Sequence, residues 1–370
     1  MFTPDFVSRG TLPVVSGTIV LRRNDVSTFA LDVIGEDNKW RRLKHGYRIV
    51  IIDDDLGEGV QLLSGWATGM VDKRDTGVQT IKVSGVSDVQ WLKQRLTLPD
   101  PAAALDAQSS AAYWKATGPA ETVIRSLVNV NAGPGALASR RAPLIIDPDQ
   151  GRGPQVSVNT RFKTVIEEAQ ALAGSALTFD IAQDIALRMS VLRFSVGRDL
   201  RRAVVLTEDN GGLPDRELTN SAPEATHVLV AGQGEGTART LKLVQGNTSD
   251  WGVYAEVFQD RRDTDAAAEL IQAGQETLTE AQEKASVSLS VTDTPRLRFG
   301  HRYGLGDTIT VQLETGGQVA DIVQQAELTY SETGRTVKLQ IGPVPDDKDA
   351  PRWVREVRRL QRRVTGLEAR

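Results

Sequence analysis

The densest group of chemically capable side chains is acidic. Asp53, Asp54 and Asp55 follow an apolar run, and Glu58 comes shortly after them. Paired carboxylates can cleave glycosidic bonds or bind a divalent cation. Acid catalysis needs a carboxyl that is buried enough to keep its proton near neutral pH, and the offsets of Gly57 and Glu58 differ from those of a calcium-binding loop. The pattern favours a solvated hairpin tip, with a glycan-binding or glycan-hydrolysing site as the alternative.

A glycine-rich segment is the second candidate. Residues 232–239 (GQGEGTAR) follow an apolar strand-like run at 228–231. Glycines after a strand let backbone N–H groups approach a phosphate, but a dinucleotide-binding loop must open a helix. Residues 240–244 (TLKLV) resemble another strand instead. We therefore expect a β-turn or bulge here, and a phosphate loop is the alternative.

The chain has few residues that could support other kinds of catalysis. The three histidines, His45, His227 and His301, lie far apart, and His45 and His301 each precede a strand, where capping or packing is the expected role. The chain has no cysteine, and neither a GxSxG nor an HExxH pattern occurs. We therefore expect no catalytic residue, no metal site and no cofactor.

Composition indicates a globular chain of 370 residues, enough for two or three domains. Hydrophobic residues make up 40% and charged residues 25%, which excludes a disordered or disulfide-stapled protein. The sequence predicts neither a membrane span nor a secretion signal. The net charge is −4, but residues 352–370 hold seven arginines and two glutamates, which leaves −9 on the remainder. We expect residues 1–351, with this negative charge, to bind nucleic acid poorly, because binding phosphates needs clustered Lys and Arg.

Most of the elements that would position these segments are strands. Short apolar runs and apolar–polar alternation predict strands over 18–21, 28–34, 48–52, 80–83, 177–181, 307–313 and 337–341. Apolar residues at helical spacing predict helices over 88–96, 119–133, 160–173 and 264–285. We therefore expect an α+β fold that is mostly β, with two small β-barrel or sandwich domains, an intervening α/β region and a C-terminal coiled-coil helix.

This order of elements predicts four parts. The first β-domain covers residues 1–98, and a linker with an α/β insertion region covers 99–190. A second β-domain with one long helix covers 191–345, and a heptad helix covers 346–370. The two β-regions echo each other weakly, since both show strand, glycine loop, strand, Thr-Gly hairpin and strand. The echo indicates either a duplicated β-domain or only the general likeness of β-meanders.

The C-terminal segment has the most specific pattern. Its apolar residues recur at spacings of 4, 3, 4 and 3, which is a heptad seam, and opposite charges at flanking positions could pair between neighbouring helices. We therefore predict an oligomer interface, and a single helix docked on its own body is the alternative. The interface residues are Trp353, Val357, Leu360, Val364 and Leu367, with Arg363 and Glu368 at the flanking positions.

Four stretches carry a resemblance to a known family. They are residues 65–85 (GWATGMVDKRDTGVQTIKVSG), 119–147 (PAETVIRSLVNVNAGPGALASRRAPLIID), 227–239 (HVLVAGQGEGTAR) and 303–313 (YGLGDTITVQL). In these stretches the chain resembles the tail-tip or baseplate hub proteins of long-tailed bacteriophages. The likeness is to the hub-like minor tail proteins of siphophages that infect actinobacteria.

The resemblance implies a homotrimer in the virion tail tip, made in the host cytoplasm. Each subunit would supply two tube-like β-domains, so that three chains join the six-fold tail tube and distal tail ring to a three-fold central tip. The expected partners are the distal tail protein, the tail tube, the tape-measure protein and a central tip or fibre protein. DNA would pass through the ring without specific binding, and an acidic channel would repel it. The hub of a phage-derived contractile injection system is an alternative that these residues barely separate from a siphophage tail.

Overall fold

The computed structural model describes residues 1–34, 43, 46–57, 59–75, 78–207, 216–246, 252–262, 264–281, 284–291, 294, 296–312, 317–332 and 334–342. Strands make up 44% of the described residues and helices 16%, which confirms the expectation of a mostly β fold. The chain forms two compact units. Residues 1–215 and 289–370 belong to the first, and residues 216–288 belong to the second.

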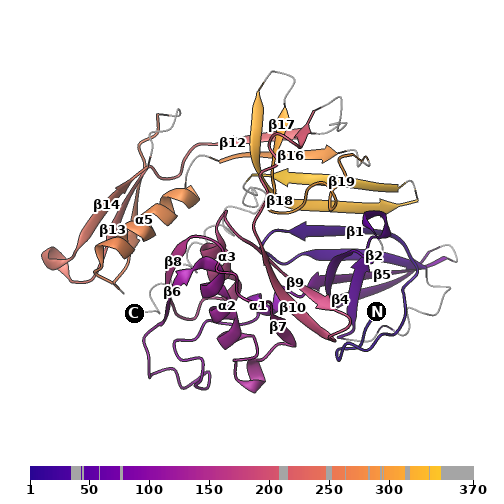
Figure 1. Ribbon diagram of the computed structural model, residues 1–370, viewed down its shortest axis with the longest axis horizontal. Helices are drawn as coiled ribbons and strands as arrows, with labels where there is room; N and C mark the ends of the chain where they lie inside the picture. Colours follow the sequence, from indigo (N-terminus) through magenta and orange to yellow (C-terminus); the bar gives the residue numbers. More distant parts are fainter. Residues whose placement is uncertain are drawn as a thin grey trace. The chain divides into compact units, whose positions relative to one another are not determined.

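The main sheet of the first unit joins strands from both ends of the chain. Its strand order is β19-β18-β1-β2-β5-β4-β3, with β17 beside β18 and the short β11 beside β17. Figure 1 shows β19, β18, β1, β2 and β5 lying side by side. The strands are β1 (Val14–Arg22), β2 (Thr28–Ile34), β3 (Arg48–Ile52), β4 (Gln61–Asp75), β5 (Val78–Ser87), β11 (Val205–Leu206), β17 (Thr308–Gln312), β18 (Gln318–Ser331) and β19 (Gly334–Ile341).

Two parts of this sheet have the same pairing pattern. We call β3-β4-β5 the first meander and β17-β18-β19 the second, and both are antiparallel. The pair Asp75–Val78 at the tip of the first hairpin corresponds to Ser331–Gly334 in the second, 256 residues later. The bulge at Ala67/Gly69 corresponds to the irregularity at Val323/Gln325 with the same offset. The echo in the sequence is therefore a likeness of register as well as of strand order.

Between the two meanders the chain forms an α/β region within the first unit. Helices α2 and α3 pack together, and their apolar faces share one core with β9 and β10. The elements are α1 (Gln90–Lys93), β6 (Trp114–Pro119), α2 (Ala120–Asn131), β7 (Leu144–Ile146), β8 (Gln155–Thr160), α3 (Val165–Ala173), β9 (Thr178–Asp184) and β10 (Met189–Ser195), with a short 3-10 turn at Ala138–Arg140. Another 3-10 turn, Asp54–Leu56, connects β3 to β4 in the first meander.

The tip of the β1–β2 hairpin anchors the sheet to this α/β region. Asn24 adopts a positive φ of 54°, which an asparagine tolerates better than most residues. Its amide donates to the Leu177 carbonyl oxygen at 2.8 Å and accepts from the Phe179 N–H at 2.7 Å. The neighbouring Arg23 donates to the Thr178 hydroxyl and to two carbonyl oxygens. The hairpin tip is thus fixed by hydrogen bonds to the start of β9.

A buried ion pair forms the second anchor. The Arg48 guanidinium on β3 and the Asp88 carboxylate after β5 contact each other, with side chains 3% and 0% exposed. Arg48 also donates to Gln183 on β9 and Ser190 on β10, and Ser64 on β4 donates to Asp88. Because these partners come from the sheet and from the α/β region, the pair links the two.

The second unit is a three-stranded sheet covered on one side by a helix. The strand order is β14-β13-β15, with β14 antiparallel and β15 parallel to β13. The chain enters this unit through β12 and returns to the first unit through β16, which lies next to β19 in the strand order. The elements are β12 (Arg216–Ser221), β13 (His227–Ala231), a 3-10 turn at Gly236–Ala238, β14 (Leu241–Gln245), β15 (Glu256–Asp260), α5 (Ala267–Ala281) and β16 (Lys284–Val291).

The predicted strands are confirmed, but the helix boundaries needed correction. The helix predicted over 160–173 begins at Val165, because Thr164 and Glu167 form a capping box that starts the helix there, and Thr160 ends β8. The helix predicted over 264–285 spans Ala267–Ala281, since β16 begins at Lys284. The helix predicted over 88–96 is the single turn α1.

Two larger expectations have a different standing. Strands from both predicted β-regions share one sheet through the β1–β18 pairing, and their division into domains at 98, 190 and 345 stays a prediction. The coiled-coil helix at 346–370 lies outside the described residues. Within the described part of the chain, no helix combines the length and the apolar character that crossing a membrane requires.

Breaking the buried ion pair should destabilise the first unit strongly. Replacing Arg48→Met leaves the Asp88 carboxylate buried without its cation, and we expect a loss of about 3–5 kcal/mol in the free energy of unfolding. Urea denaturation followed by far-UV circular dichroism measures it. The matched control is Arg201→Met, which removes an exposed ion pair with Asp199 and should leave the midpoint nearly unchanged. Equal midpoints for the two variants would contradict the anchoring role of Arg48.

Candidate assembly site

The first aspartate of the acidic cluster is a buried anchor. The Asp53 carboxylate accepts hydrogen bonds from the Tyr330 hydroxyl at 2.6 Å and from the Arg335 guanidinium at 2.9 Å. The Asp53 and Arg335 side chains are only 5% and 6% exposed. Because Tyr330 lies near the end of β18 and Arg335 near the start of β19, this carboxylate ties the end of β3 to the tip of the second meander's hairpin.

The other two aspartates do not join it. Asp54 and Asp55 lie exposed on a single 3-10 turn, and the Asp55 carboxylate is 3.9 Å from the Arg298 guanidinium. Glu58 lies outside the described residues. Among the residues that the structure describes, no group of three or more acidic or histidine side chains could hold a metal ion. The solvated tip expected from the sequence is therefore confirmed for Asp54 and Asp55 and wrong for Asp53.

The glycine-rich segment is a turn between two strands. Residues 232–239 connect β13 to the antiparallel β14, and Gly234 and Gly236 have positive φ values of 102° and 54°. The Arg239 guanidinium donates to the carbonyl oxygens of Ala231 and Gly232. The prediction of a β-turn is confirmed, because no helix opens here to direct N–H groups at a phosphate.

The two described histidines occupy different settings. The His227 ring lies 4.3 Å from the Tyr254 ring, and its Nδ1 is 2.9 Å from the Thr226 hydroxyl. His301 lies in an exposed turn, and its N–H donates to the Arg298 carbonyl oxygen. His45 lies outside the described residues.

One edge of the main sheet is filled and the equivalent edge is open. On the side of β18 opposite β19, β17 pairs with residues 318–322 and β1 pairs with residues 325–330. On the matching side of β4, β3 pairs with residues 61–66. The described β3–β4 pairing ends at Trp66, whereas the equivalent side of β18 continues to be paired through residues 325–330. A sheet edge that extends beyond its partner strand is a template for strand addition.

Side-chain burial differs between the two edges in the same way. Met70 pairs with Val83 across β4 and β5, and its equivalent Ala326 pairs with Leu339 across β18 and β19. Ala326 is fully buried, whereas Met70 is 47% exposed. The adjacent Val71 is 61% exposed. Met70 therefore lies uncovered where the equivalent Ala326 of the second meander is covered by β1, while Val71 points to the opposite face of the sheet.

The main sheet has one apolar face and one polar face. Side chains such as Ile19, Leu31 and Val83 are buried on the first. On the second, cross-strand partners of opposite charge face each other, namely Asp32 with Lys82 and Glu327 with Lys338. Small residues in register form a row across β19, β18, β1, β2 and β5, comprising Thr336, Thr329, Thr18, Ala30 and Ser84.

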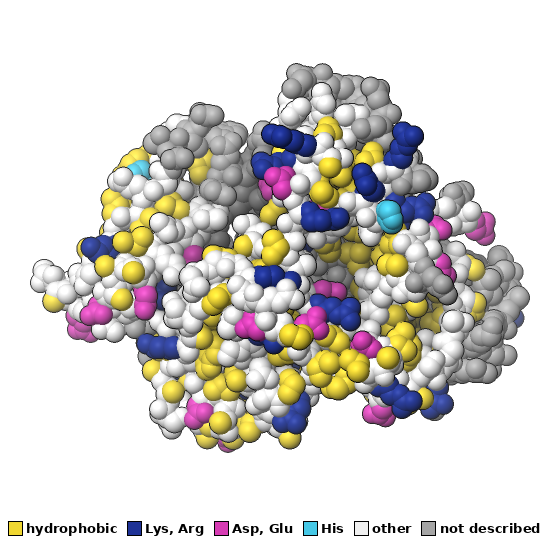
Figure 2. Space-filling view, in the orientation of Figure 1, with side chains coloured by type: hydrophobic (Ala, Val, Ile, Leu, Met, Phe, Trp, Pro, Cys, Tyr) yellow, Lys and Arg dark blue, Asp and Glu magenta, His cyan; other side chains and the backbone are white. Residues whose placement is uncertain are grey.

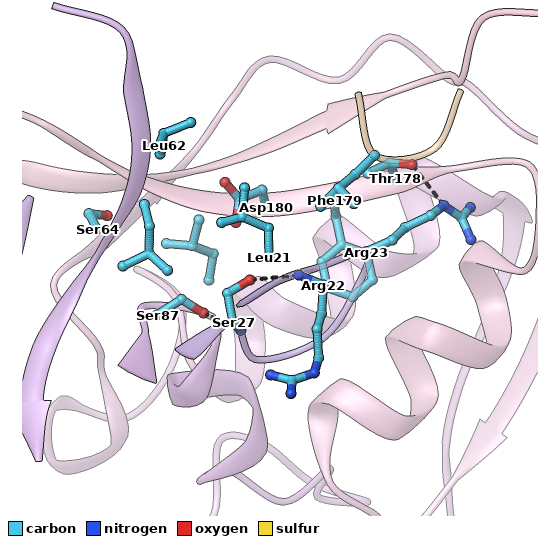
Figure 3. A pocket seen from close by; sticks show the side chains of 13 residues that line it. Leu21, Arg22, Arg23, Ser27, Leu62, Ser64, Ser87, Thr178, Phe179 and Asp180 are labelled. Carbon is cyan, nitrogen blue, oxygen red and sulfur yellow. Dashed lines mark hydrogen bonds between the residues drawn. The ribbon is translucent and has the colours of Figure 1, made fainter. Parts of the chain in front are cut away.

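A small cavity lies beside the hairpin anchor in the first unit. It has a volume of about 170 Å³, below the roughly 300–1,000 Å³ of ordinary ligand pockets. Figure 3 shows Asp180 among the side chains that line it, together with Ser27, Ser64 and Ser87. Asp180 is exposed to solvent where it borders this space. Desolvation by the neighbouring protein atoms raises the pKa of Asp180, the Ile181 N–H opposes that rise, and the charge of Asp88 adds to it.

The predicted interface residues of the C-terminal segment lie outside the described residues. They are Trp353, Val357, Leu360, Arg363, Val364, Leu367 and Glu368.

Sequence reasoning missed the anchors, because Arg48 and Asp88 are distant in sequence and belong to no motif. The Asn24 anchor had one usable signal, since an Asn-Asp turn between two predicted strands favours a positive φ.

The chain is similar to known tail proteins. A family model described as "Siphovirus ReqiPepy6 Gp37-like protein" matches residues 1–343. The 43 kDa tail protein of prophage MuSo2 from Shewanella oneidensis aligns with a TM-score of 0.55 at 14% identity, over 89% of this chain and 94% of that chain. The tail protein from Neisseria meningitidis MC58 aligns with a TM-score of 0.58 at 12% identity, over 90% and 92%. No curated protein matches the chain. At these identities the structural likeness shows a common fold.

Removing the charge of Asp180 should stabilise the protein at neutral pH. Because the pKa of Asp180 is raised in the folded state, the unfolded chain loses this proton first, as the pH rises above about 3.9. The free energy of unfolding therefore falls with rising pH until the carboxyl of the folded protein ionises too. Asp180→Asn should therefore unfold at higher urea than the wild type at neutral pH, with the difference vanishing at more acidic pH.

The control variant changes Asp199, whose pKa is shifted in the opposite direction. Hydrogen bonds from Arg201 lower the pKa of the exposed Asp199 to about 2, so that group stabilises the fold above its unfolded pKa and loses the effect as the pH falls. Asp199→Asn should therefore gain nothing at neutral pH. Urea midpoints across the acidic and neutral range measure both variants, and a neutral or negative effect of Asp180→Asn at neutral pH would refute the assignment.

Proposed function

Because the chain belongs to the family of siphovirus ReqiPepy6 Gp37-like proteins, we propose that it is a structural component of a phage tail, the hub of the tail tip. In this proposal three copies close into a ring that joins the six-fold tail tube and distal tail ring to a three-fold central tip. The tail proteins from Shewanella oneidensis and Neisseria meningitidis, which share its fold, support a role in a tail. The assignment to actinobacterial phages stays a prediction.

One observation carries the ring proposal: the sheet consists of two successive sets of four strands in equivalent order. In the strand order, β1-β2-β5-β4 of the first set corresponds to β12-β16-β19-β18 of the second. The filled edge of β18 is occupied by β1, the first strand of the other set. By the same rule, the open edge of β4 would receive β12 of the next copy.

The dimensions of the two edges agree with this closure. β1 places six residues, Gly17–Arg22, against β18, and β12 is six residues long. An antiparallel β12 on β4 would give every backbone group of the open edge a partner, and it would cover Met70 as β1 covers Ala326. Three copies, each with two sets of strands, give six equivalent sets, which matches the six-fold symmetry that the resemblance implies.

The polar face of the sheet is the proposed channel lining. Small hydroxyl-bearing residues and cross-strand pairs of opposite charge give this face little net charge, so DNA could pass without specific binding. The acidic surplus of the body is concentrated elsewhere in the sequence. Residues 216–288 contain twelve acidic and six basic residues. Repulsion of DNA by an acidic channel is therefore not part of this proposal.

The remaining partners follow from the same assembly. We propose that the distal tail protein, tail tube and tape-measure protein contact the ring from the tail side, and that a central tip or fibre protein follows from the other. The C-terminal segment would form a three-helix bundle on the axis through the heptad seam that begins at Trp353. Such a hub has a structural role and uses no cofactor.

Engineered cysteines test the β4–β12 contact without background, because the chain has no cysteine. We expect Glu217→Cys to form an interchain disulfide with either Val71→Cys or Lys73→Cys, which are two residues apart on the same face of β4 and so bracket the register. Mild oxidation followed by non-reducing electrophoresis should give cross-linked dimers and trimers. Native mass spectrometry of the wild type measures the oligomer independently.

The matched control is Glu217→Cys with Lys82→Cys. Lys82 lies opposite Val71 on β5, one strand further from the edge of β4. The sulfur of Lys82→Cys should therefore be too far from Glu217→Cys to form a disulfide. Equal cross-linking of all three pairs, or a trimer that cross-links through neither β4 position, would refute the closure. A wild type that stays monomeric at micromolar concentration would refute the ring.

Deleting residues 350–370 should weaken the trimer, because it removes the heptad seam while leaving the sheet edges intact. We expect a higher concentration of protein to be needed for trimer formation, and weaker attachment of the next tip component. Light scattering over a dilution series measures the first effect, with the substitution Arg370→Ala as the control at the chain end. Unchanged assembly and attachment would show that the segment is dispensable.

A further inference from the structure

Arg140 is a buried cation that lies in the short 3-10 turn after α2. The residue is only 5% exposed. Its Nη2 donates to the Leu96 carbonyl oxygen at 2.5 Å, whereas its Nη1 is enclosed by protein atoms and has no hydrogen-bond partner. Among the described residues, no carboxylate forms an ion pair with Arg140. A buried charge without a counter-charge is costly, so this guanidinium calls for a physical explanation.

A second guanidinium, that of Arg95, lies beside it. The Arg95 Nε donates to the Arg140 carbonyl oxygen at 2.8 Å, and its Nη1 donates to the Gln94 carbonyl oxygen at 3.2 Å. We call Arg95 and Arg140 the arginine pair. Burial and, after it, the charge of Arg95 lower the pKa of Arg140. Two like charges are therefore held close together, each by a carbonyl oxygen next to or within the other residue.

The segments that contain the arginine pair supply no negative charge. Residues 89–98 and 132–143 together contain four lysine and arginine residues and no aspartate or glutamate. The Glu168 carboxylate on the neighbouring helix α3 is bound by Lys163 instead, at 2.7 Å. The positive charge at this place is thus a property of both segments, and the fold brings them together without a carboxylate between them.

Other arginines of this molecule bind acidic partners. Arg152 contacts the Glu121 carboxylate through two guanidinium nitrogens, and Arg201 binds Asp199. Figure 2 shows acidic and cationic side chains near one another at several places on the visible surface. Among the described residues, the guanidinium groups of the arginine pair donate only to neutral carbonyl oxygens. The arginine pair therefore differs from these arginines in the charge of its partners.

We propose that the arginine pair is a binding site for an oxyanion, which is either a phosphate group or a carboxylate. A guanidinium presents its N–H groups as a planar fork that fits both of these groups. The donors left for the ligand are Nη1 of Arg140 and Nη2 of Arg95. Because Arg140 Nη1 is enclosed, binding requires the half-buried Arg95 side chain to move and close over the ligand. The arginine pair belongs to the first unit, so this inference is independent of the proposed ring.

Isothermal titration calorimetry of the full chain tests the site with inorganic phosphate and, separately, with acetate as the carboxylate. Sodium chloride keeps the ionic strength constant, because screening would otherwise change with each anion. We expect about one phosphate to bind per chain. Arg95→Met should weaken this binding at least about tenfold, because it removes one charge-assisted donor. Arg95→Gln is the second variant, which keeps a donor for the Arg140 carbonyl oxygen, and far-UV circular dichroism checks that both variants fold.

The matched control is Arg201→Met, which removes an arginine that already has an acidic partner. It should bind phosphate as the wild type does. Binding of phosphate without acetate assigns the site to a phosphate group, and acetate binding of similar strength assigns it to a carboxylate, such as the side chain of another protein. The inference is overturned if neither anion binds the wild type, or if the Arg95 variants bind as tightly as Arg201→Met. The ring is tested separately by its cross-links, so the two proposals can fail independently.

Discussion

The pairing of β1 with β18 is the constraint on which the rest of the structure depends. Its backbone hydrogen bonds join the beginning of the chain to its end, across more than 300 residues of sequence. Without this ladder the two meanders would be separate hairpin sheets with four exposed edges. With it they form one sheet, in which β4 extends beyond its partner β3 and β12 stands at the end of the strand order. The same pairing therefore creates the fold and leaves the edge to which, in the proposed ring, another copy adds.

The polar chemistry that first suggested a site holds this sheet in place. Asp53 has the residue type of a catalytic acid, yet both Tyr330 and Arg335 bind its carboxylate, which fixes the second meander against β3. Arg48 and Asp88 do the same between the sheet and the α/β region. Buried charges with this many hydrogen-bonding partners are held in fixed positions and act as rigid links. The described carboxylates thus fit a scaffold.

Local patterns in the sequence predicted the elements well and their assembly poorly. Short apolar runs located β2 and β3 to the residue. The capping box that starts a helix at Thr164 was also visible in the sequence, but the apolar spacing began earlier and placed the predicted start at residue 160. The echo between the meanders was visible because hairpin glycines mark the strand ends. What no local pattern could supply was the choice of partner for β1, since a strand's hydrogen-bonding edge looks the same in every register. The buried pair of Arg48 and Asp88 was invisible for the related reason that its members meet only after the chain has folded.

An open edge invites indiscriminate pairing, and β4 has features that limit it. Charged residues Asp72, Lys73, Arg74 and Asp75 follow Met70 and Val71 along the edge, and the Asp72 carboxylate is held by the Gln79 amide at 2.8 Å. An apolar strand that added here would have to take these charged side chains out of water, which is the usual protection of natural sheet edges. The equivalent stretch of β18 has Leu328 and Thr329 in place of Asp72 and Lys73, because its partner is fixed within the same chain. The two meanders therefore differ in that the edge of β18 is filled within the chain, whereas the edge of β4 is the one that, in the proposed ring, receives a strand of another copy.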